Sequence, residues 1–599
     1  MQMLKSGLRD MAIGVAAALT VASGASAQIA TGGGQLHVMG NTGQNFNGPD
    51  VNTLLGANRF YNAGITGQGA IAANVEAGHV WNGHDVLGHV SQFVHHPDAA
   101  GSTTADLYDD HATAVGHHLA GRAQPGASGN TFVLQSGIAY DADLRSGAIA
   151  TSFGSGGSFS INTNTVRTAY DAYFGTADVI NSSWGSSGSQ STAASADYFG
   201  IGLDGYANTS TTTTFVTSAG NSGSSGPNSV GSAGSGYNSL SVAALDRPDL
   251  GYDRVAGFSS YGPQDYWDPT AGFVTGVRAP VDIAAPGVDL HAAFYTNDPS
   301  SIAFGQPSFY NPFIDGTSFA SPIVAGGVAL LHSGRKADAT LSQNADAADA
   351  RVVKAIMLNS ADKVLGRNGQ AWDNGQQLVG GVIETTQSLD YDSGAGRMNL
   401  DRLYDQFFTA ETADLAGVDL DASGGELVGV TGWDFAELDE GGTNVYQIAQ
   451  SLAAGSLFNV TLNWFRERAQ RFNVNAVDDF AFANLDLRVV DTLTGLPIAQ
   501  SISVYNEVEH LSFQIPAEGF YRIEVDYVGD LFDVTGGWHT SEQYGLAWWG
   551  TGGSALIPEP LAAGAVLVLT LMPLRRPSRE GVISADCAVG AVHCGRWLT

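Results

Sequence analysis

The stretch DGTSFASP, residues 315–322, leads directly into an apolar run rich in small residues that ends at His332. This run, SFASPIVAGGVALLH, predicts a buried helix over residues 318–332. Ser318 would then lie at the helix start, where its hydroxyl is exposed, its backbone N–H is unpaired and the helix dipole favours negative charge. A serine so placed is a candidate nucleophile. The alternative is that Thr317 or Ser318 only caps the helix.

Upstream of this helix, short apolar runs alternate with Gly-rich loops and with stretches of helical length, from Gly69 to about Asn399. The runs AIAANV, DVINSSW, TTFVTSAG, LSVAAL and VDIAAPG, separated by such stretches, predict the parallel strands of an α/β sheet. A second helix is predicted over His111–Ala120, because Asp109 and Asp110 before it are good capping residues. Loops rich in Ser, Gly and Thr are predicted near 154–163, 186–195 and 208–238.

The character of the sequence changes after Asn399. Residues 444–550 contain segments with strand-like alternation, separated by polar turns, and no convincing helix. The segments are NVYQIA, FNVTLNW, LDLRVVD, LSFQIP, YRIEVDY and YGLAWWG. This pattern predicts an all-β sandwich that follows the α/β part.

Length, charge and cysteine content narrow the class of protein. A chain of 599 residues is too long for one ordinary core, so two or more domains are expected. The formal net charge of −32 argues against nucleic acid as a partner, since phosphates would be repelled. The only cysteines, Cys587 and Cys594, lie beyond every predicted domain, so the core is expected to lack disulfides and thiolate metal sites.

Several blocks, in order along the chain, resemble the subtilisin-like serine proteases between roughly Gly64 and Asn399. HATAVGHHLAG with His111 resembles the family's histidine helix, VTSAGNSG with Asn221 its oxyanion asparagine, and GTSFASP with Ser318 its nucleophile block. DVINSSWG resembles the strand beside the substrate, FSSYGP and VDIAAPG the segments before the nucleophile, and GAGRMN the closing strand. The resemblance implies a parallel sheet flanked by helices and an endopeptidase that acts on polypeptides.

The resemblance also implies residue roles. His111 would take the proton of Ser318 and return it to the leaving amine, while Asn221 and the backbone N–H of Ser318 would stabilise the oxyanion. Two further segments would form the edges of the S1 pocket, with the substrate added as a β-strand: Ser183, Trp184 and Gly185, and Ser218, Ala219 and Gly220. Trp184 could equally be a core or rim aromatic. This chemistry needs no cofactor, and Asp-rich loops leave structural calcium open.

The block AIAANVEAGHVWNGHDVLG departs from the family pattern, because Glu76 stands where the family has its catalytic aspartate. Gly78 and Asp85 keep the block in register. We predict that Glu76 accepts the Nδ1–H of His111, as any well-placed buried carboxylate can. Asp109 and Asp110 are rival carboxylates, although they are better placed to cap the helix. The changed residue also leaves open a catalytically inactive, protease-like surface adhesion or binding protein.

The N-terminus has the features of a signal peptide. Lys5 and Arg9 precede the apolar run from Met11 to Ala22, and the Ala-Ser-Ala at 25–27 fits signal peptidase. A signal peptide is therefore predicted over residues 1–27 and an N-terminal extension over 28–63. The stretch before Gly69 is too short for the folding prodomain usual in the resembled family.

The C-terminus resembles a PEP-CTERM sorting signal, in which Ile-Pro-Glu-Pro at 557–560 precedes the apolar run Leu561–Leu574 and two arginines. The resemblance implies a short transmembrane helix, transient membrane contact and a partner among exosortase-type sorting machinery. It also implies export to the cell surface or extracellular matrix of a Gram-negative bacterium. The alternative is a buried strand or helix. The expected order is a catalytic domain over 64–404, a β-sandwich domain over 405–552, a sorting segment over 553–580 and an unexplained tail over 581–599.

Overall fold

The computed structural model of the chain describes most residues between positions 50 and 556. The described residues are 38–39, 44–45, 50–122, 136–186, 198–247, 251–298, 300, 310–408, 426–470 and 479–556. The predicted signal peptide, both cysteines, the tail and all but the first residues of the sorting segment lie outside them. Within these ranges no helix is both long and apolar enough to cross a membrane.

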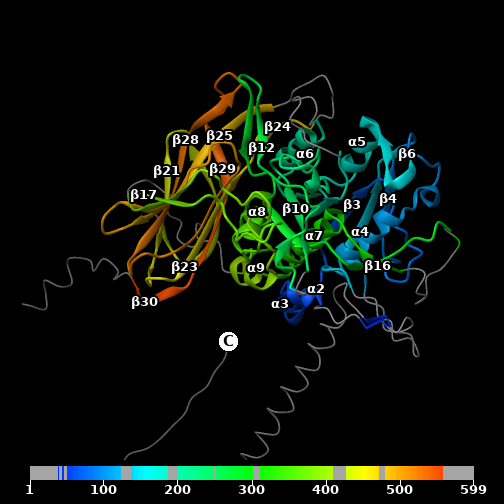
Figure 1. Ribbon diagram of the computed structural model, residues 1–599, viewed down its shortest axis with the longest axis horizontal. Coiled ribbons are helices and arrows are strands. Elements are labelled where there is room, and N and C mark those ends of the chain that lie inside the picture. Colours follow the sequence, from blue (N-terminus) through cyan, green and yellow to red (C-terminus); the bar gives the residue numbers. More distant parts are fainter. Residues whose placement is uncertain are drawn as a thin grey trace, which may run out of the picture. The chain divides into compact units, whose positions relative to one another are not determined.

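A parallel sheet forms the centre of the α/β part (Figure 1). Its strand order is β11-β10-β9-β8-β3-β5-β4, with β14 beside β10, and only β11 runs antiparallel to its neighbour. The middle strands β9 and β10 are buried along almost their whole length, as expected for parallel strands that are covered on both faces. The bounds are β3 Ile71–Glu76, β4 Gln92–His95, β5 Asp143–Ala148, β8 Val179–Ser182, β9 Thr214–Ser218, β10 Leu240–Asp246, β11 Arg254–Val255 and β14 Ile283–Pro286.

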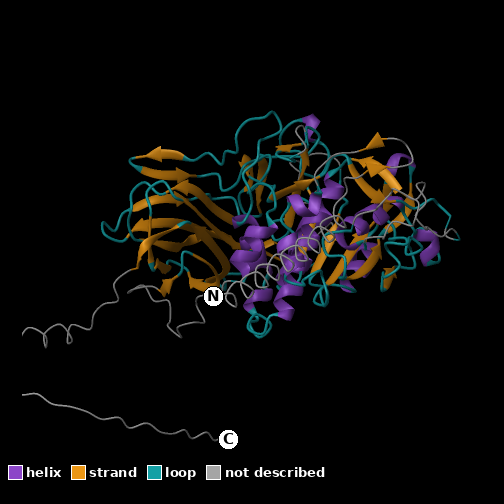
Figure 2. Cartoon of the chain, turned by 90° about the horizontal axis from the view of Figure 1, so that it is seen from below, coloured by secondary structure: helices purple, strands orange, loops and turns teal. Residues whose placement is uncertain are grey.

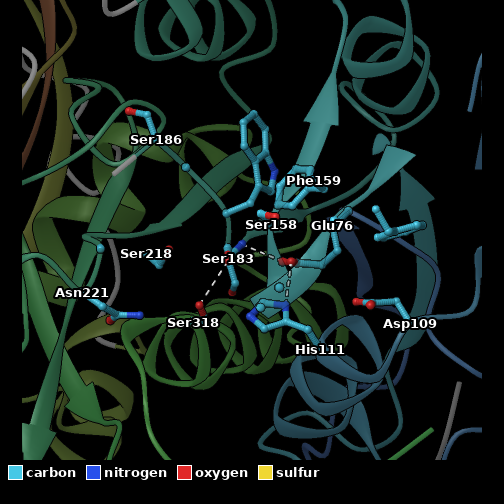
Figure 3. A pocket seen from close by; sticks show the side chains of 18 of the residues that line it. Glu76, Asp109, His111, Ser158, Phe159, Ser183, Ser186, Ser218, Asn221 and Ser318 are labelled. Atoms are coloured by element: carbon cyan, nitrogen blue, oxygen red, sulfur yellow. Dashed lines mark hydrogen bonds and ion pairs between the residues drawn. The ribbon is translucent and has the colours of Figure 1, made fainter. Parts of the chain in front are cut away.

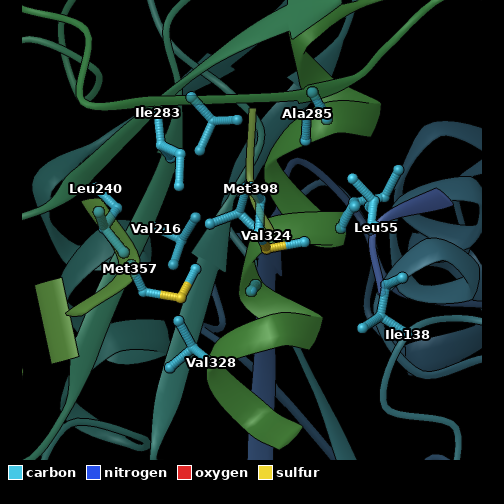
Figure 4. Close-up of a cluster of buried hydrophobic side chains, with 14 of the residues drawn as sticks. Leu55, Ile138, Val216, Leu240, Ile283, Ala285, Val324, Val328, Met357 and Met398 are labelled. Carbon is cyan, nitrogen blue, oxygen red and sulfur yellow. The ribbon is translucent and has the colours of Figure 1, made fainter. Parts of the chain in front are cut away.

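The predicted helix after residue 317 is confirmed as α7 (Thr317–Ala337), which packs against β8, β9 and β10. Figure 4 shows Val324 and Val328 of this helix in the same apolar cluster as Val216 and Leu240 of the sheet. The histidine helix is also confirmed, as α4 (Asp110–Ala120). The other helices are α2 Val51–Leu54, α3 Asn58–Asn62, α5 Thr163–Asp171, α6 Tyr198–Thr209, α8 Ala350–Asn359 and α9 Leu400–Phe407.

The α/β part also contains short two-stranded hairpins. One of them, β6–β7, lies partly in the stretch 154–163, which the sequence predicted to be a loop. The strands of the small two-stranded sheets are β1 Val38–Met39, β2 Gln44–Asn45, β6 Ala150–Phe153, β7 Phe159–Ile161, β12 Gln264–Asp268, β13 Gly272–Arg278, β15 Leu290–Ala293 and β16 Tyr310–Ile314.

The C-terminal part is built from β-strands, as predicted (Figure 2). Its two larger sheets share one apolar core, to which Val489 and Ile523 contribute from one sheet and Val460 and Leu546 from the other. The first sheet contains β17 Gln377–Val379, β18 Val382–Thr385, β19 Glu426–Val428, β21 Thr443–Ile448, β24 Glu467–Arg468, β25 Asp479–Asp491, β26 Pro497–Ser501 and β28 Tyr521–Asp533. The second contains β20 Thr431–Asp439, β23 Leu457–Trp464, β27 Val508–Gln514 and β29 Ser541–Gly550, and β22 Gln450–Leu452 pairs with β30 Gly552–Leu556.

The hairpin β17–β18 belongs to the sandwich although it precedes the predicted start of the β-domain. Strand β18 pairs in parallel with β26, which lies more than a hundred positions further along the chain. The boundary between residues 404 and 405 stays a prediction.

The α/β part and the β-rich part meet at α8, which contacts β20, β23 and β29. Charged side chains are buried at this boundary. Lys354 of α8 is 1% exposed, and its Nζ lies 2.9 Å from Asp282 Oδ1 and 3.0 Å from Glu507 Oε1 of the β-rich part. Arg278 lies 3.9 Å from the same Glu507 carboxylate, so two cations face two anions.

Candidate active site

The candidate active site lies at the carboxyl ends of the parallel strands (Figure 3). Glu76 is the last residue of β3 and Ser218 the last of β9, while Ser183 directly follows β8. The first turns of α4 and α7 bring His111 and Ser318 to the same edge. Open α/β sheets commonly place their ligand sites at this edge.

The Glu76 carboxylate contacts the imidazole of His111. Its Oε2 lies 3.2 Å from Nδ1 of the imidazole, and its Oε1 accepts the backbone N–H of Ser183 at 2.6 Å. The Glu76 side chain is 1% exposed, whereas that of His111 is 37% exposed and opens to the cleft. The Glu76 side chain, one methylene longer than an aspartate at the end of β3, therefore reaches the His111 ring.

The two rival carboxylates cap the histidine helix instead. Asp109 accepts the backbone N–H of Ala112 at 2.9 Å, and Asp110 accepts that of His111 at 2.7 Å. Their charges still act on the imidazole. Burial disfavours the charged ring, but the hydrogen bond and charge of Glu76, together with the charges of Asp109 and Asp110, outweigh it and raise the pKa of His111.

The hydroxyl of Ser318 donates to the carbonyl of Ser183 at 3.2 Å. In the part of the chain that the structure describes, it makes no hydrogen bond to the imidazole of His111. In Figure 3 the second imidazole nitrogen, away from Glu76, faces Ser318. Contacts between nucleophile and base often tighten only when substrate binds. Ser183 contacts both Glu76 and Ser318. Its backbone N–H donates to the Glu76 carboxylate, and its carbonyl accepts from the Ser318 hydroxyl.

The orientation of the Asn221 amide follows from its hydrogen bonds. Both the backbone N–H and the hydroxyl of Thr317 donate to Asn221 Oδ1, each at 2.9 Å. Because Oδ1 takes these donors, the amide nitrogen faces the other way and points towards Ser318 (Figure 3). Two N–H donors, from Asn221 and the first turn of α7, can therefore meet one oxyanion.

A cleft of about 850 Å³ is lined by all ten of the predicted site residues. These residues are Glu76, His111, Ser183, Trp184, Gly185, Ser218, Ala219, Gly220, Asn221 and Ser318. The sequence missed other lining residues, among them Asp106, Tyr108, Phe153, Ser158, Phe159, Ser186, Gly231, Ser232 and Asn297. In the sequence, Phe153 and Phe159 on either side of the Gly-rich tip of β6–β7 could have indicated that this hairpin lines the cleft.

The two predicted S1 edges both line the cleft, and so do Gly231 and Ser232. The Ser232 backbone N–H donates to Ser186 Oγ at 3.0 Å, which joins this segment to one edge. Trp184 is only 5% exposed and packs edge-on against Phe199, with ring centroids 5.3 Å apart. Trp184 is thus a core aromatic that also lines the cleft, and its place in an S1 pocket stays a prediction.

A buried polar network connects the strands and helices that carry the site residues. The sequence did not indicate this network. Ser321 of α7 donates to Asn181 Oδ1 at 2.7 Å, and Asn181 Nδ2 donates to Asn74 Oδ1 at 3.1 Å. Asn74 in turn donates to the carbonyl of Ala112 in α4 at 3.2 Å. The network ties β3, β8, α4 and α7 together, and these four elements position Glu76, Ser183, His111 and Ser318.

No group of three or more His, Cys, Asp or Glu side chains in the described ranges is placed to hold a metal ion. The Asp-rich loops there satisfy their own backbone, as Asp390 does by accepting the N–H groups of Asp392 and Ser393. Whether the protein binds structural calcium stays open.

The Subtilase family model matches residues 74–378, just over half of the chain. The matched span includes Glu76, His111, Asn221 and Ser318. No curated protein gives a significant match to the sequence.

Proposed function

The chain belongs to the subtilase family of serine peptidases, and we propose that Ser318, His111 and Glu76 are its catalytic triad, with Asn221 as oxyanion donor. It is a subtilisin-like serine endopeptidase that hydrolyses polypeptides. One observation carries the residue assignment: the buried Glu76 carboxylate lies 3.2 Å from His111 Nδ1 in the cleft that Ser318 and Asn221 also line.

The proposed reaction proceeds through an acyl-enzyme. His111 Nε2 takes the Ser318 proton as Oγ attacks the peptide carbonyl carbon, and the resulting oxyanion accepts from Asn221 Nδ2 and the Ser318 N–H. His111 then gives the proton to the leaving amine as the C–N bond breaks. Water, activated by the same imidazole, releases the acyl group. Glu76 fixes the tautomer of His111 and stabilises the imidazolium.

The substrate is proposed to lie along the two S1 edges as an added strand. Residues 183–186 and 218–222, with Gly231 and Ser232, are uncharged where they line the cleft. A buried charge without a partner is costly, so this lining suits an uncharged side chain next to the scissile bond.

Replacing Asn221 with alanine should lower kcat much more than it raises KM, because the amide meets its acceptor fully only in the transition state. The expected loss is about 10²–10³-fold in kcat, the size known for the equivalent donor of subtilisin. Asn221→Asp is the matched variant, since it keeps an oxygen for Thr317 but removes the N–H donor, and it should lose at least as much. Steady-state kinetics on a chromogenic peptide, with the exposed Asn368→Ala as control, measure both. A change confined to KM would exclude the oxyanion role.

We further propose that the protein is exported and then processed at both ends, with exosortase-type machinery acting on the sorting segment during transient membrane contact. Mass spectrometry of the native surface or matrix form should find Gln28 as the first residue and no peptide from the region after about Pro558. The same chain expressed in a host without a sorting system is the control and should keep its C-terminus. An intact Thr599 on the native form would contradict the proposal.

A further inference from the structure

A buried cluster of charges joins the β-rich part to α6. Arg468 donates to Asp204 of α6 at 2.7 Å and to Asp479 of β25 at 3.1 Å, and Arg466 contacts Asp479 at 2.5 Å. All four side chains are at most 5% exposed. The cluster is formally neutral, so the loss of one guanidinium would leave a buried carboxylate without its full partner.

Asp204 also holds a loop that follows the cleft wall. Its carboxylate accepts the backbone N–H of Tyr237 at 2.9 Å and that of Asn238 at 2.8 Å. The Asn238 side chain pairs with the backbone of the β-rich part as well, accepting the N–H of Arg466 at 2.8 Å and donating to its carbonyl at 2.9 Å. Residues 237–238 are therefore bonded both to α6 and to the β-rich part.

A third arginine, Arg278, fixes the preceding two residues of the loop. Arg278, at the end of β13, donates to the carbonyls of Ser235 at 2.5 Å and Gly236 at 2.6 Å. Its guanidinium lies 3.6 Å from the centroid of the Tyr237 ring. Four consecutive residues, 235–238, thus have a backbone group held by a buried charged side chain.

The other end of the same loop lines the cleft. The Ser235 N–H donates to the Gly231 carbonyl at 3.0 Å, which links the fixed residues to Gly231 and Ser232. A Cβ on Gly231 would lie 2.0 Å from the carbonyl oxygen of Ser186, so the backbone already packs closely against the facing wall. A shift of residues 235–238 would therefore change the shape of this end of the cleft.

We propose that Arg468 is a positioning residue for substrate binding, which acts through Asp204 to hold residues 231–238 in the shape that the substrate needs. The β-rich part then contributes to substrate binding although none of its described residues lines the cleft. A wall that is already ordered reduces the entropic cost of binding. The inference rests on the proposed function, because the cleft is taken as the polypeptide site.

The test compares Arg468→Lys and Arg468→Met with the wild-type chain. Because lysine keeps the positive charge, Arg468→Lys should fold even if Arg468→Met does not. Lysine cannot bridge Asp204 and Asp479 as the planar guanidinium does, so the link between them should still be lost. In both variants we expect the KM of an extended peptide to rise on the order of 10- to 10²-fold relative to the wild-type chain, with a smaller change in kcat. Hydrogen exchange should become faster at the amides of Tyr237 and Asn238.

Trp549→Phe is the matched control, because it removes a hydrogen bond across the same boundary, from Trp549 Nε1 to the Asn359 carbonyl at 3.0 Å. It should lower Tm and leave KM and the exchange of residues 237–238 unchanged. An Arg468→Lys variant that behaves like this control, or that exchanges faster with unaltered KM, would overturn the proposal. If the wild-type chain proves inert, the proposed function fails, and the Kd of the same peptide replaces KM in the comparison.

Discussion

Ser318→Ala is expected to abolish peptide hydrolysis, with a loss of about 10⁶-fold in kcat, the size known for the nucleophile of subtilisin. The fold should be unaffected. The hydroxyl is only partly buried and makes a single hydrogen bond, to the Ser183 carbonyl at 3.2 Å. Chromogenic peptide kinetics and thermal unfolding measure the two effects, and a fluorophosphonate label reports whether the serine is activated.

Ser333→Ala is the matched control for this experiment. It removes a serine hydroxyl from the same helix, where it donates to the Gln68 carbonyl at 2.8 Å, far along α7 from the cleft. This variant should keep both hydrolysis and labelling. A folded Ser318→Ala that still hydrolyses peptide would remove Ser318 from the mechanism. A wild-type chain that takes no label would instead favour the inactive binding protein.

Glu76→Gln is expected to fold and to lose about 10⁴-fold in kcat, as triads do when the carboxylate becomes an amide. The reason lies in the two contacts of Glu76. The glutamine oxygen can still accept the Ser183 N–H, which turns its NH₂ group towards His111 Nδ1. Nδ1 must then be the acceptor, so the proton moves to Nε2 and the base can no longer take one from Ser318.

The pH profile gives an independent check on this assignment. Glu76 raises the pKa of His111, and hydrolysis requires the neutral ring, so activity falls as the pH drops through that pKa. Removing the carboxylate lowers the pKa, and the acid limb of kcat/KM in Glu76→Gln should shift to lower pH.

Two further variants separate Glu76 from its neighbours. Glu76→Asp should also lose activity, because the shorter side chain cannot reach both Ser183 and His111. Asp110→Asn removes a nearby charge that caps α4 without contacting the ring, and it should lose far less. Equal losses in Asp110→Asn and Glu76→Gln, or wild-type turnover in Glu76→Gln, would contradict the assignment.

The sequence predicted the parts of this site that depend on local pattern. Short apolar runs indicated the buried strands, and an apolar run rich in small residues indicated α7. The blocks around His111, Asn221 and Ser318 resembled the family whose model the chain matches. All ten predicted residues line one cleft.

Contacts between distant parts of the chain could not be predicted in this way. The network of Asn74, Asn181 and Ser321 joins side chains over a hundred positions apart, and no local periodicity marks such a bond. The hairpin β17–β18 joins a sheet whose other strands follow it much later. The link from Arg468 to Asp204 likewise depends on the packing of one part of the chain against another.

The buried charges at α8 limit how this enzyme can be recombined with other modules. A foreign domain that covered Lys354 and Arg278 without supplying a carboxylate in place of Glu507 would leave Asp282 facing both cations, so that one buried positive charge would be uncompensated. Such an orphaned charge costs about 3–5 kcal/mol. The whole stability of a typical domain is only about 5–15 kcal/mol. The catalytic and β-rich halves are therefore expected to be inherited together, and a chimaera should fold only if the donor domain brings matching charges.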